Sequence, residues 1–304
     1  MTSPAPLPSA APSTAPTADP DGAPTQERAF VGSLSPSRAS DFKTCPLLYR
    51  YRSIDRLPEP ASKVATRGTL VHAVLERLYD LPATERTLPA ARDLLAPQWD
   101  RLREQEPELA EMFDGQEEAS SWLESAVGLL QTYFGLEDPT RLEPAEREQL
   151  VEVVVDGGLR LRGFVDRLDI SPAGAVRVVD YKTGAAPREA FEGKALFQLK
   201  FYALVIWRTR GVVPRQLKLL YLKDGDVLTY SPEEQELERF ERTLHALWEA
   251  IDRATQAQDF RPHKGRLCDW CSFQALCPEW GGTPPPFPVA LPIVPAAEQP
   301  VADD

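Results

Sequence analysis

Cysteine, positive charge and long apolar runs are all scarce in this chain of 304 residues. It has 4 cysteines, and 34 Lys and Arg stand against 46 Asp and Glu, which gives a formal net charge of −12. The shortage of positive charge excludes a protein coated in basic residues for bulk binding of nucleic acid, although a local basic cleft remains compatible with it. No apolar run is long enough to cross a membrane, so we expect no contact with a membrane.

Two sequence signals are missing as well. The N-terminus shows neither the basic n-region nor the apolar h-region of a secretory signal peptide. We therefore expect a cytoplasmic location, where reducing conditions make clustered cysteines a sign of a metal site more often than of a disulfide. A Gly-x4-Gly-Lys-Ser/Thr loop is also missing, so the sequence contains no recognisable ATP-driven motor.

Composition and charge divide the chain into unlike parts. Residues 1–29 and 281–304 are rich in proline and poor in core-forming residues, and we expect both to be disordered. The folded domain is expected to span residues 30–280, with a helical insert at about 81–147. Residues 81–150 hold 6 Lys and Arg against 16 Asp and Glu, so a surface that contacts nucleic acid should avoid them.

The period of the apolar residues changes along the chain from helix to strand and back. Three helical regions come first, and then three strands that turn back on one another, a helix, a hairpin and a long helix. The first helix is expected to open with Ser35 as its N-cap and Pro36 at its first position, and it leads to Cys45. The other expected elements span residues 67–79, 88–135, 150–155, 159–170, 176–182, 195–207, 216–230 and 232–254. This order predicts an α/β fold in which helices flank a mixed central β-sheet.

Two carboxylates and a lysine stand close together on the predicted strands. Asp166 lies on the second strand, and Asp180 and Lys182 lie on the third. Because side chains alternate along a strand, Asp180 and Lys182 point to the same face. Carboxylates bind hard cations such as Mg²⁺ or Mn²⁺, and a lysine beside them can orient a water molecule or stabilise a developing anion. Taken alone, the stretch is equally compatible with a surface hairpin that forms the ion pairs Asp166–Arg167 and Asp180–Lys182.

Polar side chains within apolar helices are further candidates. His72 lies near the apolar stripe of the 67–79 helix, where a lone histidine is more often structural than a ligand. Gln198 and Tyr202 share one face of the 195–207 helix at a spacing of i, i+4. A glutamine in such a helix needs a polar partner, so Gln198 is either a satisfied core amide or a residue that faces the site.

The cysteines follow a pattern that uses every one of them. Cys268, Cys271 and Cys277 form a Cys-x2-Cys-x5-Cys cluster, and Cys45 stands alone near the start of the folded part. Four thiolates suit a structural Zn²⁺ or a 4Fe–4S cluster. Zinc sites are commonly built from two Cys-x2-Cys pairs, so this arrangement favours iron–sulfur. Either metal would join the two ends of the domain.

The ordered set of motifs resembles a known family over residues 33–280. Each motif is weak alone, but the set is specific: Ser35–Tyr51 with Cys45, Gly68–His72, Gly163–Arg167, Asp180–Gly184, Gln198-x3-Tyr202 and the three late cysteines. The chain resembles the RecB-family exonucleases of the PD-(D/E)XK, restriction-endonuclease-like superfamily. The likeness is to the iron–sulfur branch, as in the AddB nuclease domain and the CRISPR-associated iron–sulfur nucleases. The chain differs from the PD-(D/E)XK motif at Val165, the residue before Asp166, where the motif has proline.

The resemblance implies a role for each matching residue. The ligands of a Mg²⁺ or Mn²⁺ ion would be His72, Asp166, Asp180 and the backbone carbonyl of Tyr181. Lys182 would position the attacking water or stabilise the pentacovalent phosphate, and Gln198 and Tyr202 would help to hold a DNA strand. The ligands of the 4Fe–4S cluster would be Cys45, Cys268, Cys271 and Cys277.

The implied activity is that of a hydrolase, a metal-dependent DNA nuclease. We expect a single-strand exonuclease in DNA repair or recombination, and a duplex end would need a separate helicase because no motor is recognisable. An endonuclease and an RNA-directed nuclease of the same fold are alternatives. A non-catalytic DNA-binding or docking module is another, although it would have no reason to keep His72, Asp166, Asp180 and Lys182 together. A zinc protein without a nuclease role is the last.

Overall fold

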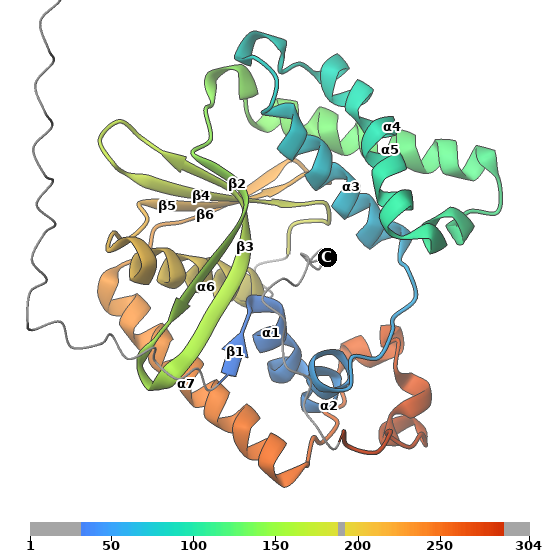
Figure 1. Ribbon diagram of the computed structural model, residues 1–304, viewed down its shortest axis with the longest axis vertical. Helices are drawn as coiled ribbons and strands as arrows, with labels where there is room; N and C mark the ends of the chain where they lie inside the picture. The colour runs from blue at the N-terminus through green and yellow to red at the C-terminus, as the bar shows by residue number, and fades with distance from the viewer. Residues whose placement is uncertain (1–31, 188–191, 289–304) are drawn as a thin grey trace, which may run out of the picture.

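A six-stranded mixed β-sheet forms the centre of the protein (Figure 1). The computed structural model describes residues 32–187 and 192–288. The strands are β1 (Gly32–Leu34), β2 (Glu146–Val154), β3 (Leu159–Ile170), β4 (Val176–Lys182), β5 (Gln216–Tyr221) and β6 (Asp226–Tyr230). The α-helices are α1 (Pro36–Thr44), α2 (Pro46–Tyr49), α3 (Lys63–Leu78), α4 (Leu88–Gln105), α5 (Gln116–Leu136), α6 (Glu192–Arg210) and α7 (Glu234–Ala257). The predicted α/β fold, with helices around a mixed sheet, is confirmed.

Strand β3 is the longest strand and pairs with three others. β2 runs antiparallel along most of it, β1 pairs in parallel with its first residues, and β4 pairs antiparallel with its last four. β5 continues the sheet parallel to β4, and β6 closes it as an antiparallel neighbour of β5. Gly157 and Gly158, both with positive φ, form the tight connection between β2 and β3.

The two faces of the sheet carry separate apolar cores. Helices α6 and α7 cover one face, and the group α3–α5 covers the other (Figure 1). Because strand side chains alternate, β4 contributes Val176 and Val178 to the first core, and Val179 and Tyr181 to the second. The predicted apolar stripe of α3 is buried, and it holds this helix against the second face. Among the helices of the described residues, none is both long and apolar enough to span a bilayer.

The chain after α7 returns to the N-terminal helices (Figure 1). The hydroxyl of Tyr51 donates to the carbonyl of Leu276 at 2.7 Å, and Arg50 donates to the carbonyl of Pro285. Phe287 stacks on Phe260 with ring centroids 6.1 Å apart. Residues 284–288 are therefore packed, whereas the sequence predicted disorder from residue 281. The predicted disorder of residues 1–29 and 289–304 lies outside the described residues.

Candidate metal centre

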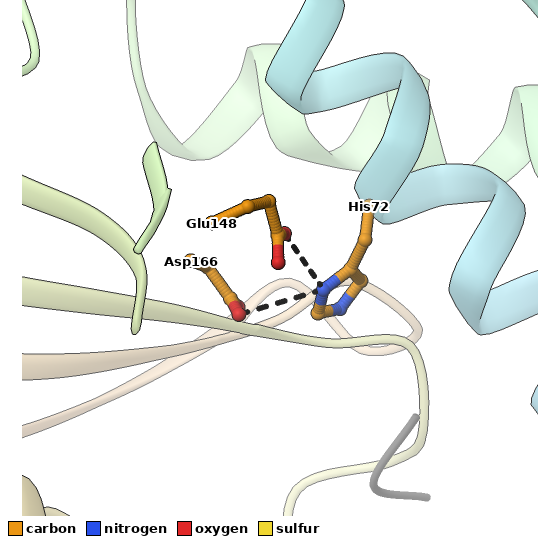
Figure 2. A group of neighbouring side chains, drawn as sticks. All are labelled: His72, Glu148 and Asp166. Carbon is orange, nitrogen blue, oxygen red and sulfur yellow. Dashed lines mark ion pairs between the residues drawn. The ribbon is translucent and has the colours of Figure 1, made fainter. Parts of the chain in front are cut away.

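One histidine and two carboxylates converge where α3 meets the sheet. The ligand atoms of His72, Glu148 and Asp166 all lie within 4.8 Å of one another. Figure 2 shows the carboxylate groups of Glu148 and Asp166 directed at the imidazole ring of His72. His72 comes from α3, Glu148 from β2 and Asp166 from β3, so the group exists only when the helix is packed on the sheet.

Strand register brings Glu148 to Asp166. Arg147 pairs with Arg167 and Gln149 pairs with Val165, which sets Glu148 opposite Asp166. Glu148 also has a φ of 43°, a left-handed conformation that residues other than glycine adopt rarely. Strained backbone of this kind concentrates at functional sites, where the surrounding structure enforces it. Here it interrupts the regular pairing at the position where the Glu148 side chain faces His72.

The two ring nitrogens of His72 have different surroundings. Nε2 lies 2.9 Å from the carbonyl oxygen of Tyr181, and because a carbonyl only accepts, Nε2 carries the proton of this hydrogen bond. Nδ1 lies 3.7 Å from Oε1 of Glu148 and 3.6 Å from Oδ1 of Asp166. Burial alone would lower the pKa of His72, but the two carboxylates, Asp166 above all, outweigh it and hold this pKa well above its ordinary value of 6.5.

Asp166 is fixed by a backbone hydrogen bond from the neighbouring strand. Its Oδ2 accepts from the N–H of Tyr181 at 2.6 Å, which leaves Oδ1 on the side of His72. Burial acts to raise the pKa of Asp166, but the charges of His72 and Lys182 and the Tyr181 N–H bring it below its ordinary value. Asp166 is therefore an ionised carboxylate with one oxygen directed at the centre.

Asp180 lies beside this group, at the point where β3 and β4 separate. Their pairing ends with Arg167 opposite Val179, and the same register sets Asp180 opposite Asp166. Oδ1 of Asp180 accepts from Nε2 of Gln198 at 3.2 Å, and Oδ2 lies 3.0 Å from Nζ of Lys182. Burial raises the pKa of Asp180 to about 7, although Lys182 opposes the shift.

The structure brings together most of the residues that the sequence singled out. Six of them lie at or beside the centre: His72, Asp166, Asp180, Tyr181, Lys182 and Gln198. Tyr202 is 5% exposed and packs on β3, where a Cβ at Gly163 would lie 2.8 Å from its ring. It thus sets the distance between α6 and β3, and its predicted part in holding DNA stays a prediction.

Sequence reasoning missed Glu148. The predicted strand began at residue 150, whereas β2 begins at Glu146. Glu148 also belongs to the acidic segment 81–150, which we expected to lie away from any site for nucleic acid. Counting the hairpin register back from the turn at Gly157 and Gly158 would have set residue 148 opposite Asp166.

The donor atoms at this centre fit a divalent cation. Nδ1 of His72 and the carboxylates of Glu148 and Asp166 face one another, and Asp180 lies next to them, whereas the Tyr181 carbonyl lies on the Nε2 side of the ring. Oxygen donors suit Mg²⁺ and Mn²⁺, and a single imidazole among them is accepted better by Mn²⁺. Without a cation, Glu148 and Asp166 stabilise a proton on Nδ1 of His72, and a bound cation would replace this proton.

The four cysteines lie together at a second place in the fold. All of them line one cavity of about 280 Å³, between the N-terminal helices and the segment after α7. The backbone N–H groups of His263 and Gly265 donate to the sulfurs of Cys45 and Cys268 at 3.3 and 3.2 Å. Burial raises the pKa of the Cys271 thiol, and the neighbouring Cys277, Cys45 and Cys268 add to this shift.

Comparison with known proteins agrees with this geometry. The family model of the PD-(D/E)XK nuclease superfamily matches residues 33–278, and the chain therefore belongs to that superfamily. Gene 69 protein of Mycobacterium phage D29 is 27% identical over 200 residues, which cover 59% of this chain and 70% of the phage protein. A candidate exonuclease from Eubacterium rectale has a TM-score of 0.52 at 13% identity, over 79% of this chain and 86% of its own. That likeness shows a shared fold.

Membership in the superfamily implies a hydrolytic nuclease that uses divalent metal ions. The group of His72, Glu148 and Asp166 could bind one such ion. The resemblance to the superfamily is thus confirmed, while the resemblance to its iron–sulfur RecB branch stays a prediction.

Binding of a divalent cation should strengthen as the pH rises. His72 must lose a proton before Nδ1 can bind metal, and Asp180, with a pKa of about 7, must be ionised. Both groups hold more protons at low pH, and each proton released on binding makes the affinity rise by up to about tenfold per pH unit. We expect calorimetric titration to show Mn²⁺ binding at least about tenfold weaker at pH 6 than at pH 8. An affinity for Mn²⁺ that is constant or falls between pH 6 and pH 8 would contradict the assigned protonation states. The variant Asp180→Asn, which lacks one of the two titrating groups, should show a weaker dependence of this affinity on pH.

Proposed function

We propose that this protein is a metal-dependent exonuclease that hydrolyses single-stranded DNA from its ends, in DNA repair or recombination. One observation carries the proposal. His72, Glu148 and Asp166 converge where β3 and β4 separate, and Asp180 and Lys182 stand directly beside them. Membership in the PD-(D/E)XK nuclease superfamily supports hydrolysis as the reaction.

We assign the ligands of a Mg²⁺ or Mn²⁺ ion to His72, Glu148, Asp166 and Asp180. The Tyr181 carbonyl accepts from Nε2 of His72, so it can join the predicted ligands only if the imidazole ring turns over. When bound, such an ion polarises the phosphate and lowers the pKa of a water molecule. Lys182 is the cation that can donate a hydrogen bond to the attacking water or to a phosphate oxygen. Gln198 orients Asp180, and the Tyr181 N–H orients Asp166, so the carboxylates are held before substrate arrives.

The proposed substrate, a single DNA strand, has to be supplied by another protein or be single-stranded from the start. Because it contains no recognisable nucleotide-binding motor loop, we propose that a separate helicase unwinds duplex ends or that the substrate is already single-stranded. The cytoplasm is the compartment in which we place this reaction.

We further propose that the four cysteines hold a 4Fe–4S cluster. The four cysteines line one cavity, and their order in the sequence, one cysteine and then a Cys-x2-Cys-x5-Cys cluster, differs from the two Cys-x2-Cys pairs that are common at zinc sites. N–H groups that donate to Cys45 and Cys268 stabilise anionic sulfur, as is common around iron–sulfur clusters. Measured iron and acid-labile sulfide would support this assignment, whereas stoichiometric zinc would replace it with the zinc alternative.

Cys271→Ser is expected to reduce stability more than chemistry. Metal-binding free energy at such a site is folding free energy, so we expect a loss of at least about 3 kcal/mol, or about 6–12 °C in melting temperature. Contacts such as Tyr51 to Leu276 still join the two ends of the domain, so the variant should remain folded at low temperature. Thermal unfolding of anaerobically purified protein measures the effect, with the exposed neighbour Ser272→Ala as the control. An unchanged melting temperature in Cys271→Ser would count against any metal at this place.

The proposed activity is tested with linear and circular single-stranded DNA and RNA in the presence of Mn²⁺ or Mg²⁺. Degradation of linear DNA alone would support a single-strand exonuclease. Cutting of circles would replace the proposal with an endonuclease, and preference for RNA would replace the substrate. Binding of DNA without cleavage, even after addition of a helicase, would favour the non-catalytic docking module.

A further inference from the structure

The segment that carries three of the cysteines exposes large apolar side chains. Leu267, Trp270 and Trp280 are 63%, 78% and 48% exposed. Among the described residues, Trp270 is the most exposed large hydrophobic side chain, and it stands between Cys268 and Cys271. Leu267 and Trp270 are three residues apart on one 3-10 turn and so lie on the same side of it, and Leu267 and Trp280 both border the cavity that the cysteines line. Exposed apolar side chains gathered in this way are a typical sign of a binding surface.

Other residues anchor this segment, so the two tryptophans are not needed for its packing. Phe273 is 4% exposed and lies 5.2 Å from the ring of Tyr51, centroid to centroid. The Tyr51 hydroxyl donates to the Leu276 carbonyl, and Gln274 donates to the Cys268 carbonyl. Trp270 and Trp280 are therefore free to act as a binding surface on a fixed loop.

The charge of the same segment identifies the kind of partner. Lys264 and Arg266 are exposed just before the tryptophans, and neither forms an ion pair within the residues that the structure describes. In a chain with a net charge of −12, such a place suits a phosphate backbone. Asp269 and Glu279 are exposed on the segment too, so stacking rather than charge would supply most of the affinity. Aromatic faces beside a few basic groups are the usual equipment for binding single-stranded nucleic acid.

We propose that Trp270 and Trp280, with Lys264 and Arg266, form a base-stacking site for single-stranded DNA that is separate from the metal centre. The proposal deepens the proposed function and rests on it, because it supplies the surface that holds the strand while its end is hydrolysed. It predicts that this protein selects single strands over duplexes at the cysteine segment, since only unpaired bases can stack on a tryptophan face.

The distance between the two places sets a length requirement. Pro36, at the start of α1, packs near Gly163 of β3, which lies three residues before Asp166, and Cys45 follows the end of α1. A helix of this length and three residues of strand, laid end to end, span on the order of 25 Å, which is an upper limit for the distance from Asp166 to Cys45. A stacked strand advances about 3.4 Å per nucleotide, so up to about seven nucleotides cover this distance.

The test is binding of labelled oligonucleotides of 4 and 20 nucleotides (about half and three times the required length) by fluorescence anisotropy. The variant Trp270→Ala/Trp280→Ala is compared with its parent in an Asp180→Ala background, which prevents degradation. We expect the double variant to bind both single strands at least about tenfold more weakly and a blunt duplex as before. Trp270→Phe/Trp280→Phe should recover most of the loss, and Val212→Ala, an exposed apolar residue elsewhere, should have no effect.

Melting curves first show that the variants are folded, and each outcome then supports or contradicts the stacking site. Unchanged affinity for the 20-nucleotide strand would overturn the stacking site and favour a protein partner for this surface. An equal loss for the single strands and for the blunt duplex would also overturn it, because the tryptophans would then act through the fold. If the wild type cleaves nothing but the loss of affinity for single strands is seen, the stacking site stands and the nuclease function fails. If the wild type cleaves DNA and the tryptophan variant binds it normally, the nuclease function stands and the stacking site fails.

Discussion

Asp180→Ala is expected to slow DNA cleavage by at least about 10³-fold while single-strand affinity changes little. Asp180 stands where β3 and β4 separate, and its carboxylate meets both Gln198 and Lys182. Its removal takes away one proposed oxygen ligand and leaves Lys182 without the carboxylate with which it pairs. Single-turnover cleavage with Mn²⁺, beside equilibrium binding of the same strand, separates the loss of chemistry from a loss of substrate.

The matched control is Asp226→Ala, which removes an exposed carboxylate at the start of β6. It should cleave at the rate of the wild type. Asp180→Asn keeps the shape of the side chain and guards against a folding defect in the alanine variant. Cleavage within about tenfold of wild type in both Asp180 variants would remove Asp180 from the chemistry, since a metal-site donor of this kind is worth about 10²-fold or more.

Arg167→Met is expected to cause the largest loss of stability of any single substitution considered. Arg167 is fully buried and donates to Glu137 at 2.7 Å and to Asp169 at 3.1 Å. It also donates to the hydroxyls of Tyr79 and Tyr181, at 3.0 and 2.9 Å. Removing the guanidinium leaves the carboxylate of Glu137, which is almost wholly buried, without its cation. Breaking a buried pair in this way costs about 3–5 kcal/mol, or about 6–20 °C in melting temperature.

A double-mutant cycle identifies the origin of this loss. Glu137→Gln/Arg167→Met should be less destabilised than the sum of the two single variants, because the unpaired buried charge is then gone. Arg103→Met, which removes the cation of an exposed pair with Asp100, should change stability by less than about 1 kcal/mol. A loss of under about 1 kcal/mol for Arg167→Met would show that the network does not hold the helices of the insert to the strands.

The hydrogen bonds of Arg167 also help to fix the geometry of the candidate metal centre. Arg167 follows Asp166 on β3, and Tyr181 precedes Lys182 on β4. The contact of Arg167 with the Tyr181 hydroxyl therefore fixes the segment whose backbone N–H and carbonyl meet Asp166 and His72. The packing of α3 and α5 against the sheet is in this way coupled to the geometry of the carboxylates.

Elements with a strong local pattern were predictable from the sequence. The apolar stripe of α3 and the glycine turn between β2 and β3 both follow from rules that act over a few residues, and the structure confirms them. Strand β1 was not predicted, because its three residues carry no period of their own and become a strand only by pairing with β3. The position of Glu148 opposite Asp166 was not predicted for a similar reason, because it depends on the pairing register of β2 with β3.

Residues of the site were predictable where local spacing defines them. Asp180 and Lys182 share a face because they are two residues apart on a strand, and they form an ion pair. Taken alone, the sequence is equally compatible with a surface pair of Arg167 and Asp166, but Arg167 is buried and pairs with Asp169 and with Glu137, which packing brings from thirty residues away. Such contacts depend on how distant elements meet, and no short motif encodes them. His72 entered the prediction only through the family resemblance, since a lone histidine on a helix has no distinctive pattern.

The most direct measurement is an anomalous difference map from crystals soaked in Mn²⁺, recorded at the manganese absorption edge. We predict a peak bounded by Nδ1 of His72 and the carboxylates of Glu148 and Asp166, with Asp180 beside it. That result would establish the centre and add Glu148 to its ligands. A peak elsewhere, or none at this place with saturating Mn²⁺ above pH 8, would contradict the assignment of these residues as a metal centre for phosphodiester hydrolysis.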